Sequence, residues 1–220
     1  MRKNRIRSSS FLWIGLLIAC QNKPAPTQPT PPKNQKSDLK QIRATHLVDS
    51  ARHFLHAGAI VLRRGNDAIS SLFAELNKTD KSYSHCGIAF QEEGRWYVYH
   101  SIGGEDNPDA RLRRDAFSTF VRRDHNYGFA IAQLRLKPAQ TASLQELVKS
   151  WYHEGKPFDM QFDLKSDDRL YCAEMLYKAF NQVIDGPGCF PVTEHRGFRY
   201  VSTDNIYRNK AVEMLCRINY

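Results

Sequence analysis

The chain has 220 residues and a formal net charge of +9, from 32 Lys and Arg against 23 Asp and Glu. Four of the basic residues lie within the first seven positions, and without them 28 basic residues face 23 acidic ones, a charge of +5. This modest excess suits an anionic membrane or cell-wall surface, and we expect no nucleic-acid partner because no stripe of Lys and Arg interleaved with aromatic residues is present.

The first 20 residues are typical of an export leader. Basic residues at positions 2, 3, 5 and 7 precede an apolar run over residues 11–18, which is too short to span a bilayer as a helix. The run ends in Leu17-Ile18-Ala19-Cys20, which resembles a bacterial lipobox. The resemblance implies cleavage before Cys20 and lipid on its thiol. An ordinary signal peptide or a short anchor is the alternative.

We therefore divide the chain into a lipoprotein signal peptide (residues 1–19), a lipidated Cys20 with a Pro-rich tether (20–37) and one globular domain (38–220). The lipid would hold the protein to the membrane of the bacterial cell envelope. Gln21 rather than Asp after the cysteine favours the outer membrane, facing the periplasm, in a Gram-negative cell. We expect a monomer.

The first half of the globular part alternates helix and strand signals. Apolar residues at helical spacing predict helices over residues 38–57 and 68–77, with a short buried strand at 59–62 between them. The predicted apolar stripe of the first helix consists of Leu39, Ile42, Leu47, Ala51, Phe54 and Leu55. Residues 84–90 and 96–100 flank a polar turn and predict a β-hairpin.

Beyond the hairpin, we expect a loop over residues 103–113, a short helix over 115–122 and a strand over 129–134. Pro138 opens a helix that runs to about residue 154, and an irregular stretch then leads to a helix near residues 170–180. A Gly/Pro loop at 186–188, a turn of helix near 203–207 and a strand around 212–218 complete the chain. The predicted class is α+β, with helices packed on a mostly antiparallel sheet.

Cys172 falls in the first turn of the helix near residue 170. Unpaired N–H groups and the positive end of the helix dipole favour a thiolate there, and the thiolate is the nucleophilic form of cysteine. Such a nucleophile needs a histidine base that the fold brings close, and His85 on the hairpin is the best candidate. The pattern indicates a cysteine hydrolase. The N–H of Cys172 is the first oxyanion donor, and Tyr171 or Tyr83 could supply a second.

The hairpin also carries a second histidine. Strand alternation places His85 and Gly87 on one face, and a register that pairs Ala89 with Trp96 aligns the ends of the two strands. His100 then lies opposite His85, where it could fix the tautomer of that imidazole and stabilise its protonated form. Gly87 would leave room for a helix terminus to approach.

Four segments in this order and spacing resemble one family. They are residues 58–65 (GAIVLRRG), 83–88 (YSHCGI), 155–159 (GKPFD) and 171–175 (YCAEM). Together they resemble the YiiX/YebB-like group of circularly permuted papain-like proteins in the NlpC/p60 superfamily. The resemblance implies a permuted papain-like fold and cysteine hydrolysis of amide or related acyl bonds. Cys172 and His85 match the motif positions, whereas the third position, often Glu in the group, is His100 here.

The expected substrate is a cell-wall peptide or an N-acyl, lipid-linked compound, for which Phe158 could line the groove. We expect no cofactor. The alternative function is a catalytically silent envelope-binding domain that keeps the fold. Glu174 belongs to the motif, but two residues along a helix from Cys172 it points elsewhere and is expected to be structural.

Other interpretations of the cysteines and histidines carry less weight. Exported proteins often form disulfides, and Cys189 and Cys216 are the preferred pair, with Cys86 in the core and Cys172 free. A zinc site would have to use His85, Cys86, His100 and Cys172. We expect none, because His85 and Cys86 point to opposite strand faces and no CxxC or HExxH spacing is present.

Overall fold

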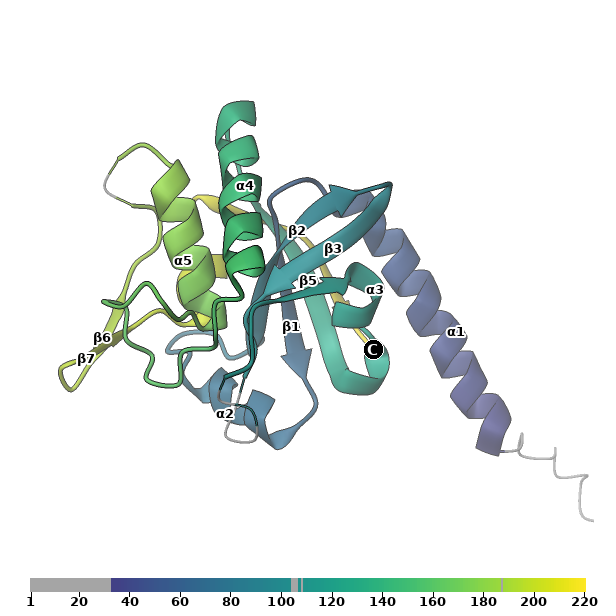
Figure 1. The fold of residues 1–220 in the computed structure, drawn as a ribbon. Helices are drawn as coiled ribbons and strands as arrows, with labels where there is room; N and C mark the ends of the chain where they lie inside the picture. Colours follow the sequence, from purple (N-terminus) through teal and green to yellow (C-terminus); the bar gives the residue numbers. More distant parts are fainter. Residues whose placement is uncertain (1–32, 104–106, 108, 187) are drawn as a thin grey trace, which may run out of the picture.

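The computed structural model describes residues 33–103, 107, 109–186 and 188–220 and contains a six-stranded antiparallel sheet with helices on both faces (Figure 1). The strand order is β4-β3-β2-β1-β5-β8. These strands are β1 (Ala59–Gly65), β2 (His85–Glu92), β3 (Arg95–His100), β4 (Arg113–Ala116), β5 (Asn126–Leu134) and β8 (Val212–Asn219). The expected α+β class with an antiparallel sheet is confirmed.

Helices cover the sheet unequally. One face carries α4 (Pro138–Glu154) and α5 (Cys172–Val183), and the other carries α3 (Phe117–Phe120) and the end of α1 (Lys33–Ala51) (Figure 1). The remaining helices are α2 (Ala68–Glu75), α6 (Thr203–Tyr207) and the 3₁₀ turns Arg52–Phe54 and Arg123–His125. A separate hairpin of β6 (Thr193–His195) and β7 (Phe198–Tyr200), which the sequence did not predict, follows α5.

The sheet therefore separates two hydrophobic cores. Ile60 and Leu62 of β1 face the larger core beneath α4 and α5, whereas Val61 faces the smaller core beneath α1 and α3. Because β1 lies between β2 and β5 and is covered on both faces, its first four residues, 59–62, form an apolar run instead of an alternating pattern.

The β2–β3 hairpin closes through a two-residue turn. Glu93 and Gly94 both have positive φ angles, 49° and 75°, as a type I′ turn requires. The strands continue to this turn, and Ala89 consequently pairs with Val98. The predicted pairing of Ala89 with Trp96 is wrong by two residues because it assumed a longer loop. A shift of two keeps each side chain on its predicted face. The expectation that His100 lies directly opposite His85 is wrong, because this register places His100 beside Gly87.

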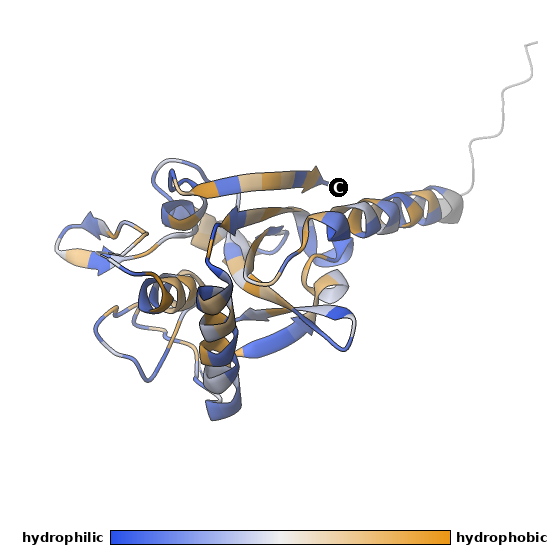
Figure 2. Ribbon diagram, turned by 90° about the horizontal axis from the view of Figure 1, so that it is seen from above, coloured by the Kyte–Doolittle hydropathy of each residue, from blue (hydrophilic) through white to orange (hydrophobic). Residues whose placement is uncertain are grey.

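The first helix differs most from its prediction. It begins at Lys33, inside the expected tether, and ends at Ala51. Ala44, Val48 and Ala51 are its buried residues, whereas Leu39 and Ile42 are exposed. The expected stripe is wrong at these two positions because only the last turns reach the sheet and the rest projects from the body (Figures 1 and 2). It is also wrong at Phe54, which is exposed in the 3₁₀ turn after the helix.

The predicted helix over residues 115–122 is shorter than expected. Asp115 belongs to strand β4, where it pairs with Val98, and the helix spans only Phe117–Phe120. The predictions for α2, α4, α6 and β8 are confirmed to within two residues at each end.

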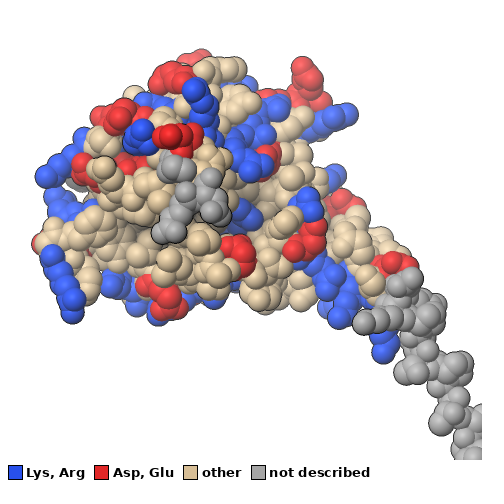
Figure 3. All heavy atoms as spheres, turned by 60° about the horizontal axis from the view of Figure 1, so that its bottom comes forward, with Lys and Arg blue, Asp and Glu red and all other residues tan. Residues whose placement is uncertain are grey.

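Within residues 33–103, 107, 109–186 and 188–220, no helix combines the length and apolar character needed to cross a membrane. Cys20 and the expected leader lie outside the described residues. On the face drawn in Figure 3, Lys and Arg are interspersed with Asp and Glu instead of gathering into one basic region.

Candidate active site

The beginning of α5 fixes the position of Cys172. Tyr171 has extended backbone angles and is the N-cap, and its N–H donates to the Glu174 carboxylate at 3.1 Å. Just before it, the Leu170 N–H donates to the Pro157 carbonyl, and the Ser101 hydroxyl donates to the Leu170 carbonyl. Because Ser101 directly follows β3, this last bond ties the start of α5 to the end of that strand.

The Cys172 sulfur is buried and lies among hydrogen-bond donors. Its side chain is 8% exposed. The Cys86 thiol lowers the pKa of Cys172, and the backbone N–H groups of Cys86 and Ala173 and the charge of Arg63 act in the same direction against burial. The pKa values of the other described thiols are raised by burial, that of Cys189 to about 11. Cys172 is therefore the most acidic thiol in the described chain.

Three side chains on neighbouring strands form a hydrogen-bonded relay. His85 Nε2 lies 2.9 Å from His100 Nδ1, and His100 Nε2 lies 3.1 Å from Asp115 Oδ2. The Asp115 carboxylate can only accept, so His100 Nε2 carries the proton and His100 Nδ1 is the acceptor for His85 Nε2–H. His85 Nδ1 is then unprotonated and is the atom of the relay that can act as a base.

The relay is buried against aromatic rings. The Phe120 ring lies 5.6 Å from that of His85 and 4.8 Å from that of His100, between ring centroids. Burial lowers the pKa of His100 to about 4, against the effect of Asp115, and burial together with Arg63 and His100 lowers the pKa of His85 well below its ordinary value. Both imidazoles are consequently neutral at neutral pH, as a general base must be.

Gly87 makes room for this relay in a different way from the prediction. A Cβ on Gly87 would lie 2.5 Å from Val98 Cγ1 and 3.0 Å from His100 Cβ. The neighbour that requires glycine is thus strand β3 and not the start of α5. The expectation that Gly87 admits a helix terminus is wrong.

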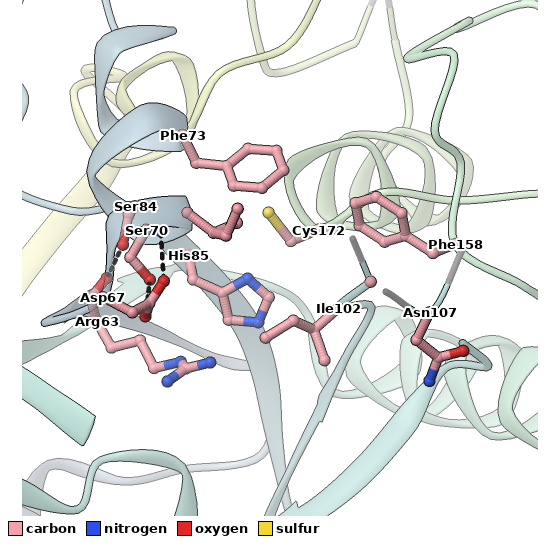
Figure 4. A pocket seen from close by; sticks show the side chains of 12 residues that line it. Arg63, Asp67, Ser70, Phe73, Ser84, His85, Ile102, Asn107, Phe158 and Cys172 are labelled. Atoms are coloured by element: carbon pink, nitrogen blue, oxygen red, sulfur yellow. Dashed lines mark hydrogen bonds between the residues drawn. The ribbon is translucent and has the colours of Figure 1, made fainter. Parts of the chain in front are cut away.

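Cys172 and His85 line one cavity of about 390 Å³ (Figure 4). Arg63, Asp67, Ser70 and Ser84 lie on one side of the pair, and Ile102, Asn107 and Phe158 lie on the other (Figure 4). In the described part of the chain the Cys172 thiol and the His85 imidazole are not hydrogen-bonded to each other; the contacts of the sulfur are with Cys86 and Ala173. Catalytic hydrogen bonds often tighten only when substrate is bound.

Tyr171 and Tyr83, the two candidates for a second oxyanion donor, have their side chains away from the cavity. The Tyr171 hydroxyl accepts the Val201 N–H at 2.8 Å inside the core, and the Tyr83 ring packs against Tyr207. Neither tyrosine is among the residues that line the cavity, and both side chains make these contacts in the core. Phe158 does line it, and Glu174 is fully buried in the cap of α5 with an ion pair to Lys178.

The structure also bears on the expected cysteine pairing and on the metal ligands that were considered. Cys86, Cys172, Cys189 and Cys216 are free thiols. The preferred pairing of Cys189 with Cys216 is wrong, because Cys189 packs beside the larger core and Cys216 beside the smaller one, on the opposite face of the sheet. Among the described residues, no three His, Cys, Asp or Glu side chains are grouped as metal ligands.

The sequence analysis missed Asp115 and Arg63. Asp115 was assigned to a helix, and only its pairing in β4 brings it to His100. Arg63 was assigned to the end of a strand, where it pairs with His85 across the sheet. The GAIVLRRG segment, which contains Arg63, was the one available signal for this residue, and nothing local indicated Asp115.

Comparisons with known proteins agree with this architecture. A family model described as permuted papain-like amidase enzyme, YaeF/YiiX, C92 family, matches residues 54–188. The crystal structure of metalloprotein YiiX from Escherichia coli O157:H7 is similar to the chain with a TM-score of 0.61 and 17% sequence identity, over 75% of this chain and 98% of that one. No curated protein matches. The permuted papain-like fold is therefore shown. That protein is described as a metalloprotein. The candidate ligands described in this chain do not fit a metal, since His85 Nε2 and His100 Nδ1 are hydrogen-bonded to each other.

Proposed function

Because the chain belongs to the family of permuted papain-like amidases, we propose that it hydrolyses an amide or related acyl bond with Cys172 as nucleophile and His85 as base. The observation that carries this proposal is the relay from Asp115 through His100, which leaves His85 Nδ1 free as a base in the cavity that Cys172 also lines. His100 and Asp115 are positioning residues in this account.

The reaction has two stages. In the first, His85 Nδ1 takes the thiol proton, the sulfur attacks the carbonyl carbon, and the same proton passes to the leaving amine or alcohol as the acyl–nitrogen or acyl–oxygen bond breaks. In the second, His85 takes a proton from water, the hydroxide attacks the thioester, and the proton returns to the sulfur as the acid is released. The Cys172 N–H at the start of α5 stabilises the oxyanion in both stages.

His100 and the Asp115 carboxylate hold in place the proton on His85 Nε2, which is not transferred in the reaction. His85 becomes a cation in each stage, and His100 Nδ1 accepts a hydrogen bond from its Nε2–H throughout. This bond holds the ring in one tautomer and orientation and stabilises the imidazolium. No metal or cofactor takes part in these steps.

Turnover of amide substrates tests this function. We expect the purified protein to release amine from N-acyl amides or from cell-wall peptide fragments, and we expect Cys172→Ala to lower turnover by about 10⁴-fold or more. Cys216→Ala is the matched control, because that thiol lies on the opposite face of the sheet, and it should keep wild-type activity. Turnover by Cys172→Ala equal to that of the wild type would remove Cys172 as the nucleophile. No turnover of either substrate class by a folded protein would favour the silent envelope-binding domain instead.

We also propose that the mature protein is anchored to the bacterial envelope by lipid on Cys20, on the outer membrane and facing the periplasm in a Gram-negative cell. The support is the lipobox-like sequence alone. Fractionation of cells that express Cys20→Ala checks the anchor. The variant should appear in the soluble fraction, and unchanged membrane retention would contradict lipidation.

A further inference from the structure

The cavity has two chemically different ends, and this division bears on the substrate of the proposed amidase. Phe73, Phe158, Ile69 and Ile102 contribute apolar side chains to its lining. Phe73 and Phe158 are in edge-to-face contact, with ring centroids 6.5 Å apart, and the Phe158 ring lies against Gly103, where a Cβ would approach it to 2.6 Å. On this side the cavity fits an apolar group.

The other end is built around Arg63. Its side chain leaves strand β1 beside His85, and the guanidinium lies 5.0 Å from the centre of the Phe120 ring. One hydrogen bond, from Nη1 to Asn126 Oδ1 at 3.1 Å, is the only one that its donors make within the described residues, and its buried Nε has no partner. None of the described carboxylates lies within 4.0 Å of the guanidinium, although Arg63 is partly buried and its Nε is buried.

Among the described acidic groups, Asp67 has the largest electrostatic effect on Arg63, but it is not paired with the guanidinium. Asp67 lies at the rim of the cavity as the N-cap of α2, and its two carboxylate oxygens accept from the Ser70 N–H at 2.7 Å and the Ser70 hydroxyl at 2.7 Å. With respect to the described residues, Arg63 therefore has donors left for a ligand. Guanidinium groups recognise carboxylates in particular, because two parallel N–H bonds match the two oxygens.

We propose that the substrate is an amide that joins an apolar acyl group to a moiety with a free carboxylate, and that Arg63 binds this carboxylate while Phe73 and Phe158 hold the acyl group. The reactive pair, Cys172 and His85, lies between the two ends in Figure 4, where the scissile bond would lie. Such a compound is either a long-chain N-acyl amino acid or a peptide with an apolar residue before its carboxyl terminus. This inference rests on the proposed function.

Binding to an inactive protein tests the proposal directly. The Cys172→Ala variant is titrated by calorimetry with N-dodecanoylglycine and with N-dodecanoylglycinamide, below their micelle concentrations, and then with N-acetylphenylalanylglycine and its amide. We expect the acid to bind roughly 10- to 100-fold more tightly than the amide in at least one of the two pairs. The pair with the larger preference identifies the lipid or the peptide as the source. Equal affinities within both pairs, or no binding at all, overturn the proposal.

Substitution of the arginine assigns the preference. In Cys172→Ala/Arg63→Gln the preference for the acid should fall to within about twofold, whereas Cys172→Ala/Arg64→Gln should keep it. Arg64 is the matched control because it is the next residue on β1 and does not line the cavity. A preference that survives Arg63→Gln in a protein with wild-type thermal unfolding overturns the role of Arg63. If Arg63→Gln fails to fold, the acid–amide comparison on Cys172→Ala still decides.

Turnover separates this proposal from the amidase itself. Cys172-dependent hydrolysis of acid and amide at equal rates would leave the amidase in place and remove carboxylate recognition. A binding preference for the acid without any Cys172-dependent hydrolysis would support carboxylate recognition and remove the amidase.

Discussion

The nucleophile and the imidazoles belong to opposite faces of the sheet and are built in different ways. Cys172 takes its position from one helix start, with its cap and the Cys86 thiol beneath it, in the larger core. His85, His100 and Asp115 come from three successive strands, and each depends on the pairing of its strand with the next. The helix half of the site, around Cys172, is local in sequence. The sheet half, made of His85, His100 and Asp115, exists only once the sheet has formed.

The two halves also carry opposite pH dependence. His100 is buried and neutral, and its pKa of about 4 lies below the ordinary value, so the stability that it contributes is present above pH 6.5 and is lost as pH falls toward 4. Glu174, in the cap of α5, has its pKa raised to about 7 by burial, against Lys178. The free-energy cost of keeping Glu174 buried therefore grows as pH rises from 4.5 to 7. A fall in pH from 6.5 to 4 therefore weakens the sheet half, and a rise from 4.5 to 7 weakens the helix half.

The largest effect that distinguishes the halves is expected at His100. His100→Leu leaves His85 Nε2–H without its acceptor and should lower kcat by on the order of 10²–10⁴-fold. His100→Gln should restore part of this loss, because its amide can accept from His85 and donate to Asp115. Cys172 should still react with iodoacetamide in both variants. Wild-type kcat in a folded His100→Leu protein would reduce the site to Cys172 and His85.

Unfolding in urea at several pH values tests the opposite pH dependence. Relative to wild type, the free energy of unfolding of Glu174→Gln should rise by up to about 3 kcal/mol between pH 4.5 and 7. That of His100→Gln should rise by a similar amount as pH falls from 6.5 to 4, because the buried neutral imidazole no longer has to be protonated on unfolding. Parallel pH profiles for the two variants would contradict this assignment.

A smaller effect is expected one step further along the relay. Asp115→Asn removes the carboxylate that fixes the His100 tautomer, and kcat should fall by about 10- to 100-fold. Arg113→Gln is the control, since Arg113 is paired with the same carboxylate at 3.0 Å on the surface and its loss should change kcat less than threefold. If both substitutions have the same effect, Asp115 acts through general stability and not through His100.

The contrast between local and long-range construction explains what the sequence revealed. The start of α5, the position of Cys172 in it and the extent of α4 follow from spacing, a capping pattern and a proline. The strand faces of His85 and His100 were also predictable, since alternation survives a register shift of two residues. The pairing of His100 with Asp115 was not predictable. Strand β4, which carries Asp115, is short and highly charged, and its pairing with β3 is set by the packing of Phe117 and Phe120.

The partial burial of Arg63 was also not predictable from the sequence. Arg63 looks like an ordinary charged residue at the end of an apolar strand, and its burial depends on Phe120 from a distant segment. The same holds for the separation of Cys189 and Cys216, which only the two-faced sheet reveals.

Alkylation of the individual cysteines across pH tests the central claim, that Cys172 is the activated nucleophile. Iodoacetamide is added to the folded protein between pH 5 and 9, and modification of each cysteine is read by mass spectrometry. Cys172 should react first, with appreciable labelling at pH 6, because its pKa is the one that the surroundings lower, while Cys86, Cys189 and Cys216 follow only at higher pH. Faster labelling of Cys189 or Cys86 at pH 6 would contradict the account.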